Sequence, residues 1–489
     1  MASFNTTAKN RMKTTNKSGH AAYEMDSRTE LVTMALTTMI GEPKYYGDNT
    51  DDLIESAEDL CKSGDGEFVA KLAVWARTKG NLRSVSHALV SVAGKWCSGQ
   101  TSDDGESFVR KATREIALQR GDDGTEIIAT YLSLYGKPLS HAIQRGVRDA
   151  LSLAKPYAIA KYQSKSKQLK MRDTLRITHP VAAYPDTEAA MGECIKDTLQ
   201  KPKSWETELS ARGNTKEVWN ELIEENRIPY MAALRNLRNM ITAGANIDPV
   251  LDMISNRDAV AKSRQLPFRF FSAYRELAQA NLTSTKIARA IDMALIASCR
   301  NVDRLPGRTA VLIDTSGSMG CRISQKSTVE CRDIAAILGA MTSHISDDAL
   351  AIRFDTSASV IPFSGLSILT DMSLVPAAGG GTDMAAGFNC LMSSGFDADR
   401  VIVLSDNEVN GGWWGDNKKV IQSKMDQYRK KVGHDVWCHA IDLQGYGTQQ
   451  FYGPKTNVIA GWSEQVLRFV SLAERGFGGI VEEIDGVVL

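Results

Sequence analysis

Long hydrophobic runs are missing from this 489-residue sequence. Because no stretch approaches the about eighteen apolar residues that span a bilayer, we expect no transmembrane helix and no membrane partner. The start, MASFNTTAKNRMKTTNKSG, lacks the apolar core of a signal peptide. The eight cysteines form no CxxC pair and no Cys/His cluster. This spacing argues against a zinc site and predicts reduced thiols in a cytoplasmic protein.

Catalytic signatures are also absent. The sequence has no GxxxxGK[ST] loop, no GxSxG element and no nuclease-type cluster of carboxylates. We therefore expect a protein that is not an enzyme. Net charge is absent as well, since 58 Lys and Arg balance 58 Asp and Glu. Only the local distribution of charge can then indicate a nucleic-acid partner.

The length predicts several domains, and the sequence pattern changes along the chain. Residues 1–20 are basic and predict a flexible arm. Residues 21–300 show helical stripes such as Phe68, Leu72 and Trp75, with Gly- or Pro-bearing breaks, which predict an α-solenoid of stacked helical pairs.

From residue 301 to 489, short apolar strands alternate with helices, one of them near 328–344. The expected strands are Thr309–Ile313, Ala349–Phe354, Val401–Leu404 and Val436–Ile441. This order predicts a Rossmann-like α/β domain with a mostly parallel sheet. The fold class is thus multidomain, α plus α/β.

Three polar motifs of the C-terminal domain could hold a metal. The motif Asp314-Thr-Ser316-Gly-Ser318 ends the first expected strand, GGGTD contains Thr382, and Asp406 ends another strand. Ligand sites of such folds lie at the carboxyl ends of the strands, so we expect these side chains to meet. Hydroxyl and carboxylate oxygens favour Mg²⁺ or Mn²⁺. The alternative is a hydrogen-bonded polar turn.

A basic stretch in the helical domain is a candidate RNA-binding site. Residues 155–176 carry seven Lys or Arg against one Asp, with Tyr157, Tyr162 and His179 close by. Cations neutralise phosphates and aromatic rings stack on bases. The candidate residues are Lys161, Lys165, Lys170, Arg172, Arg176 and His179. A solvated helix face is the alternative, and His179 could instead be a buried core histidine.

Two further features are weaker candidates. Arg235, Arg238 and Asn239 form a polar stripe opposite Leu234 and Leu237, which is either an RNA contact or a solvated face. The pair Trp413-Trp414 lies in a Gly-rich loop after Asp406; packing on its own domain is favoured over partner docking.

The three metal motifs, in order, resemble the metal-ion-dependent adhesion site of von Willebrand factor A domains. A second series of segments resembles the TROVE module of the Ro autoantigen family. Its members are Gly19–Glu24, Gly41–Tyr46, Asn81–His87, Ala160–His179 and Ala233–Met240. The region 161–179 departs from the family in loop length and keeps Lys where the family often has Arg.

The resemblance implies a monomeric ring of HEAT-like repeats, whose ends are brought together by the adhesion-type domain. It implies that Y-type small RNAs bind the outer surface, where Lys161, Lys165 and His179 match contact positions and Arg172 and Arg176 lie in the intervening motif. Single-stranded 3′ ends of misfolded or decaying RNAs would enter a central hole. An exoribonuclease is a further possible partner, in a scaffold role for RNA quality control.

A different class remains open. Residues 301–489 could be a metal-dependent protein-assembly module, as in the adhesion-type subunits of metal chelatases. That alternative explains the metal motifs and leaves the basic stretch without a function. The resemblance to the adhesion site of von Willebrand factor A domains also implies that the metal binds a partner's carboxylate and is not catalytic.

Overall fold

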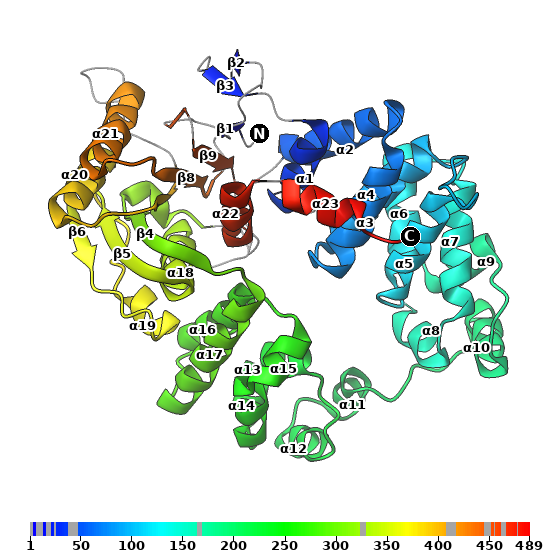
Figure 1. Cartoon of the computed structure of the whole chain (residues 1–489). Coiled ribbons are helices and arrows are strands. Elements are labelled where there is room, and N and C mark those ends of the chain that lie inside the picture. The colour runs from blue at the N-terminus through cyan, green and yellow to red at the C-terminus, as the bar shows by residue number, and fades with distance from the viewer. Residues whose placement is uncertain are drawn as a thin grey trace. The chain divides into compact units, whose positions relative to one another are not determined.

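The computed structural model of the chain (Figure 1) describes residues 3–5, 13–15, 21–23, 26–37, 47–163, 169–322, 329–406, 417–444, 451–453, 455–460, 466–476 and 478–489. The chain forms two compact units. One unit contains residues 25–203 and 477–489, and we call it the helical unit. The other contains residues 1–24 and 204–476, and we call it the mixed unit.

The helical unit consists of helices along the whole of its described length. They are α1 (Ser27–Thr37), α2 (Gly47–Lys62), α3 (Gly66–Thr78), α4 (Arg83–Trp96), α5 (Phe108–Leu118), α6 (Asp123–Tyr135), α7 (His141–Ser152), α8 (Pro156–Tyr162), α9 (Met171–Thr178), α10 (Pro185–Ile195) and α23 (Gly478–Asp485). The apolar stripe predicted on α3 is buried, with Phe68, Leu72 and Trp75 at most 2% exposed. Burial of one apolar face is what holds such helices together.

The helices stack as the predicted solenoid requires. Each of α2, α3, α4 and α5 packs against the helix two places further along the chain. The contact between α5 and α7 is close, since a Cβ added at Gly146 would lie 2.6 Å from the carbonyl oxygen of Arg110. A side chain at position 146 would therefore push the two helices apart.

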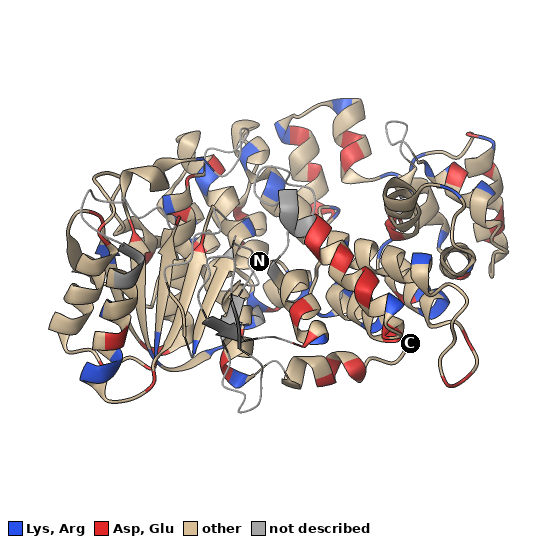
Figure 2. Cartoon of the chain, turned by 90° about the horizontal axis from the view of Figure 1, so that it is seen from above, with Lys and Arg blue, Asp and Glu red and all other residues tan. Residues whose placement is uncertain are grey.

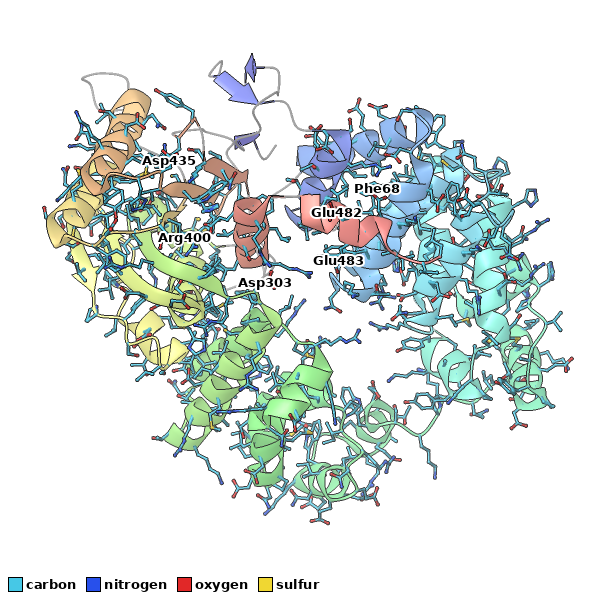
Figure 3. All side chains as sticks on the ribbon, in the orientation of Figure 1. Phe68, Asp303, Arg400, Asp435, Glu482 and Glu483 are labelled. Carbon is cyan, nitrogen blue, oxygen red and sulfur yellow. The ribbon has the colours of Figure 1, made fainter. Side chains whose placement is uncertain are left out.

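The last helix of the chain belongs to this unit. Helix α23 packs against α1 and α3. The indole of Trp75 donates to Glu483 (3.1 Å), and Arg28 forms an ion pair with Asp485 (2.8 Å). Figure 3 labels Glu482 and Glu483 on α23 together with Phe68 on α3. The C-terminal residues thus fold with the first helices of the unit.

A buried carboxylate ties three helices of this unit together. Asp123, fully buried at the start of α6, accepts hydrogen bonds from Arg77 (2.9 Å) and Arg83 (2.6 Å) and lies 3.3 Å from His87. Burial raises the pKa of Asp123, but hydrogen bonds from His87 and Arg83 and the charges of both arginines outweigh it and hold that pKa below its usual value. Arg83 and His87 belong to the segment 81–87 that resembles the Ro family.

The mixed unit begins its main segment with helices as well. These are α11 (Trp205–Arg212), α12 (Lys216–Glu224), α13 (Tyr230–Thr242), α14 (Asp248–Ser255), α15 (Arg257–Ser263), α16 (Pro267–Gln279) and α17 (Thr285–Ser298), followed by the 3-10 turn η1 (Cys299–Asn301). Helix α17 packs on α14, α15 and α16. The change from helices to alternating strands near residue 300 therefore falls inside one compact unit.

An open sheet follows. Its strands are β4 (Leu305–Asp314), β5 (Ser346–Phe354), β6 (Ala358–Ile361), β7 (Arg400–Ser405), β8 (Trp437–Asp442) and β9 (Thr456–Ala460), in the spatial order β9-β8-β7-β4-β5-β6. Pairing among these six strands is parallel except for β6, so the predicted mostly parallel sheet is confirmed. The predicted basic arm supplies two strands. β1 (Ser3–Asn5) pairs antiparallel with β9 at the edge of this sheet, and β2 (Lys13–Thr15) pairs with β3 (Ala21–Tyr23), which follows the arm.

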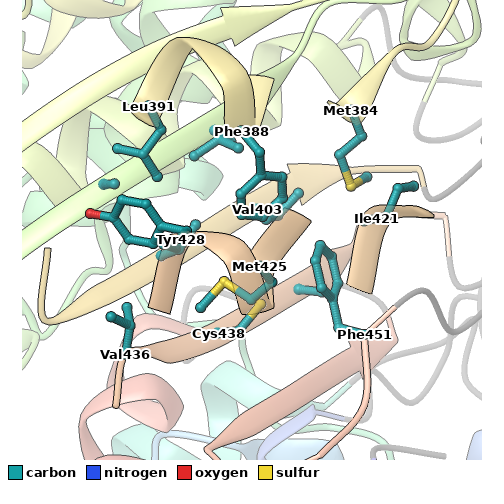
Figure 4. Close-up of a cluster of buried hydrophobic side chains, with 14 of the residues drawn as sticks. Met384, Phe388, Leu391, Val403, Ile421, Met425, Tyr428, Val436, Cys438 and Phe451 are labelled. Carbon is teal, nitrogen blue, oxygen red and sulfur yellow. The ribbon is translucent and has the colours of Figure 1, made fainter. Parts of the chain in front are cut away.

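Helices cover both faces of the sheet. They are α18 (Cys331–Ile345), α19 (Ile368–Ser373), α20 (Met384–Ser394), α21 (Asn417–Val432) and α22 (Val466–Arg475). Figure 4 shows the core between α20, α21 and the sheet, where Phe388, Met425 and Tyr428 pack on Val403 and Cys438. Alternate strand residues face α18 and α22, as the two-residue period of a strand requires.

Glu474 of α22 is one anchor on that second face. It accepts from Arg400 (2.7 Å), a residue labelled in Figure 3, and from the fully buried His439 (3.0 Å). Arg400 also donates to Thr309 (2.8 Å) of β4. The network fixes the helix over three strands.

A second buried carboxylate joins the helices of this unit to its sheet domain. Asp333, fully buried near the start of α18, pairs with Arg275 of α16 (2.7 Å) and with its neighbour Arg332 (2.6 Å). Asp292 of α17 accepts from the backbone N–H of Leu369 (2.9 Å) in α19. Two polar contacts therefore connect the last helical pair with the layer that covers the sheet.

We expect Asp333→Ala to destabilise the protein strongly. The change leaves Arg275 and Arg332 beside a buried site without their counter-charge, which typically costs about 3–5 kcal/mol. Urea-induced unfolding measures the loss. Asp348→Ala is the matched control, because its partner Arg308 is on the surface and the pair is half-exposed; it should cost at most about 1 kcal/mol. Equal losses of stability in the two variants would contradict the stabilising role given to the buried Asp333.

The lowered pKa of Asp123 predicts a pH-dependent contribution to stability. A carboxyl whose pKa is depressed by folding stabilises above its unfolded pKa, about 3.9 for Asp, and loses that contribution as the pH falls through the folded value. The difference in unfolding free energy between the parent and Asp123→Asn should be largest at neutral pH and shrink below about pH 4. A difference that stays constant across the acid range would show that Asp123 titrates normally.

Candidate functional sites

The predicted metal ligands meet at the carboxyl edge of the sheet. Asp314 ends β4 and Asp406 follows β7, and these strands are parallel neighbours. The backbone N–H of Ser316 donates to Asp314 Oδ1 (2.8 Å), and the Ser405 hydroxyl donates to Oδ2 (2.6 Å). The hydroxyl oxygens of Ser316 and Ser318 lie 3.2 Å apart.

The loop that carries Thr382 lies against the same turn. The backbone N–H of Gly379 donates to the Thr315 carbonyl (2.9 Å), and that of Gly317 donates to the Gly380 carbonyl (3.1 Å). These two bonds fix the GGGTD loop beside the Asp314 turn. All five predicted ligands therefore come from segments that adjoin one another.

Two carboxylates at this edge are buried, which a hydrogen-bonded polar turn at the surface does not require. Asp314 and Asp406 are both fully buried. Burial raises the pKa of Asp314 to about 6, and the charge of Asp406 adds to the effect, whereas hydrogen bonds from Ser316 and Ser405 oppose it. Two adjacent buried carboxylates beside hydroxyl groups make a donor set that fits a hard cation.

Thiols next to this edge were not predicted to lie together. Cys321 and Cys331 have sulfur atoms 3.1 Å apart, and all eight cysteines are free thiols. Among the residues with described positions, no three His, Cys, Asp or Glu side chains cluster as metal ligands. A metal here would thus depend on two carboxylates and on hydroxyl groups.

The basic stretch of the helical unit is partly available at the surface. We call Lys161, Lys170, Arg172, Arg176 and His179 the basic surface. His179 is exposed at the end of α9, so it is not a buried core histidine, and Arg176 is exposed as well. Lys165 lies outside the described residues, as do Trp413 and Trp414.

Some of these cations already have partners. Arg172 pairs with Asp197 (3.4 Å), and Arg176 donates to the carbonyl of Ile195 (3.1 Å). The Lys161 ammonium lies 5.7 Å from the centre of the Tyr157 ring. The equal numbers of acidic and basic residues are interspersed over the helices (Figure 2), so the basic surface is a local feature.

The polar stripe on α13 lines a cavity. This cavity, of about 600 Å³, lies between α13 and α16, and we call it the arginine cavity. Its polar lining includes Arg235, Arg238, Asn239, Gln265, Arg269 and Glu276. Leu234, Leu237 and Leu277, each 1% exposed, belong to its apolar lining.

Two of the three arginines carry charge that the cavity does not neutralise. Arg238 pairs with Glu276 (3.1 Å). Arg235 and Arg269 are exposed, and within the described part of the chain neither has an acidic partner. The predicted stripe is thus one wall of a basic cavity. Arg269 was missed because it comes from another helix, 34 residues after Arg235 in the chain (269 − 235).

These features define a protein of helical repeats joined to an open α/β domain. Residues 186–332 match the family model of the TROVE domain. The crystal structure of the Deinococcus radiodurans RO (RSR) protein is similar, with a TM-score of 0.58 and 17% identity over 94% of this chain and 96% of that one. The two chains share a fold. Over residues 186–332 this chain is thus similar to the TROVE domain, and over nearly its whole length it is similar in fold to the RO (RSR) protein.

Curated relatives share a short stretch. Telomerase protein component 1 of Rattus norvegicus is 45% identical over 82 residues, and that of Mus musculus is 44% identical over 79. Each match covers 16% of this chain and 3% of the relative's length. The described helices include none that is long and apolar enough to cross a membrane.

Proposed function

We propose that this protein binds RNA and is not an enzyme. The observation that carries the proposal is the arginine cavity, whose lining residues 231–277 fall inside the TROVE match at 186–332. Its volume lies within the range of about 300–1,000 Å³ that is typical of ligand sites. Arg235 and Arg269 supply the positive charge that a phosphate backbone needs.

The cavity suits single-stranded RNA. The partly exposed Met231 and Ala273 of its lining can contact an unstacked base while the arginines contact the adjoining phosphates. A duplex presents its bases stacked and paired, so it could not use the cavity in this way. We assign single-stranded 3′ ends of misfolded or decaying RNA to this cavity.

The basic surface suits a structured RNA. Lys161, Lys170 and exposed His179 offer cations and a hydrogen-bond donor on the face of short helices, a pattern that reads phosphate positions. We therefore propose a small non-coding RNA of the Y type for this surface. A protein with two such RNA sites is a scaffold for RNA quality control, and an exoribonuclease would be a fitting partner.

The edge with Asp314 and Asp406 carries a second proposal. We infer that Asp314, Ser316, Ser318, Thr382 and Asp406 hold Mg²⁺ or a similar hard cation, as in the adhesion site of von Willebrand factor A domains. Such an ion would offer an open coordination place to a carboxylate of a partner protein. This observation favours a protein-assembly role for the α/β domain alongside RNA binding.

Removing the free charges of the cavity should weaken single-strand binding. Arg235→Ala/Arg269→Ala should lower the affinity for an unstructured RNA oligonucleotide and make its salt dependence shallower, by about 0.7 log–log units for each phosphate that the variant no longer neutralises. Fluorescence anisotropy over a salt series measures both. Arg212→Ala is the control, because that arginine is already paired with Glu221 (2.8 Å). Unchanged affinity and slope in the double variant would refute the cavity as an RNA site.

The metal site should be separable from RNA binding. Asp314→Asn keeps an oxygen for the Ser316 N–H and removes the charge. The parent should gain about 2.7 kcal/mol of stability at a hundredfold excess of Mg²⁺ over its dissociation constant, and the variant should gain almost none. Thermal melting with Mg²⁺ or with a chelator measures this. We expect the variant to bind RNA nearly as well as the parent; a loss of RNA affinity in a folded variant would contradict separate sites.

A further inference from the structure

We propose that Tyr157 and Tyr184 form a stacking site for unpaired RNA bases beside the basic surface. The inference rests on the proposed RNA function and specifies which part of a structured RNA this region recognises. Both rings are unusually exposed for their size, at 52% for Tyr157 and 57% for Tyr184. Large aromatic rings are usually packed against other side chains, so exposed pairs of them commonly mark a binding surface.

The two tyrosines come from helices that pack on each other. Tyr157 lies in the first turn of α8, and Tyr184 directly precedes α10, which packs against α8. The backbone N–H of Ala183 donates to the Ser152 carbonyl (2.8 Å), and the Thr187 hydroxyl donates to the Ala154 carbonyl (2.8 Å). These bonds hold the loop before α10 against the connection between α7 and α8. Both rings are thus carried by anchored backbone, which limits the entropy lost on binding.

Exposed apolar side chains and cations both occur in the segments around Tyr157 and Tyr184. Leu153, which follows α7, is 42% exposed, and Val181, in the connection between α9 and α10, is 80% exposed, so the segments that lead into α8 and α10 also carry exposed apolar side chains. The Lys161 ammonium lies 5.7 Å from the centre of the Tyr157 ring and 5.9 Å from that of Tyr162. Arg120 lies 5.2 Å from the Tyr162 ring. Aromatic faces therefore alternate with cations.

This mixture fits RNA with unpaired bases. A base has a flat apolar face and is joined to a phosphate, so it can stack on a tyrosine while a neighbouring Lys contacts the charge. The exposed His179 follows α9, only five residues before Tyr184 (184 − 179). A fully paired helix would contact the cations and leave the rings unused. We therefore assign to this surface an RNA in which a bulge or loop interrupts a helix.

The experiment compares two hairpin RNAs that differ only in a bulge of unpaired nucleotides. Tyr157→Ala/Tyr184→Ala should reduce the affinity for the bulged hairpin by roughly 5- to 100-fold, from the usual range for base stacking, and leave the fully paired hairpin unchanged. Tyr157→Phe/Tyr184→Phe is the matched control, because it keeps both rings and should bind like the parent. Thermal melting confirms that each variant is folded.

A second readout reports stacking directly. The fluorescence of 2-aminopurine placed in the bulge should be quenched on binding the parent and the Phe variant, and stay bright with the Ala variant. Lys161→Ala should weaken both hairpins and make the salt dependence shallower. If the lysine change weakens binding while the Ala variant binds and quenches like the parent, the stacking site is refuted and the proposed RNA function stands. If the parent binds neither hairpin, assignment of a structured RNA to the basic surface fails, and the stacking site fails with it.

Discussion

The ion pair between Arg275 and Asp333 determines how the mixed unit is built. Arg275 extends from α16, and Asp333 lies fully buried near the start of α18. A carboxylate in such a position is stable only with its cations in place, so the helices cannot move away from the α/β layer without exposing a buried charge. This pair and the bond from Leu369 to Asp292 add two polar contacts to the packing of the helices against the sheet domain.

Helix α16 contributes to two different features of the mixed unit, the arginine cavity and the ion pair with Asp333. Arg269, Ser272, Ala273 and Glu276 recur at helical spacing and line the arginine cavity. Phe271 is buried, and Arg275, four residues later, points to Asp333. One helix therefore carries a candidate RNA site on one face and the anchor of the α/β domain on another. The same helix can serve both because residues three or four apart share a face and intermediate ones do not.

The sequence predicted the elements whose signals are local and missed those that depend on distant contacts. The strands around Val311 and Val403 contain continuous buried runs and the strand around Ile352 is partly buried, and the structure has all three within a few residues of the expected bounds. Parallel strand order then brings Asp314 and Asp406 to one edge, which topology alone implies. By contrast, the cavity needed Arg269 from a second helix, and the pairing of Arg172 with Asp197 joins residues from different elements. Both features join residues that are far apart in the chain, so no short sequence motif predicts them.

We expect the metal site at Asp314 and the arginine cavity to act separately. Asp333 is the shared element, since it follows the metal-site turn in the chain and binds the helix that lines the cavity. Two arginines pair with Asp333, which is fully buried. Coupling between sites requires an element with two accessible states that each ligand biases. Because Asp333 is fully buried and paired with both arginines, we expect an ion bound at Asp314 to stabilise the α/β domain without changing the arginine cavity.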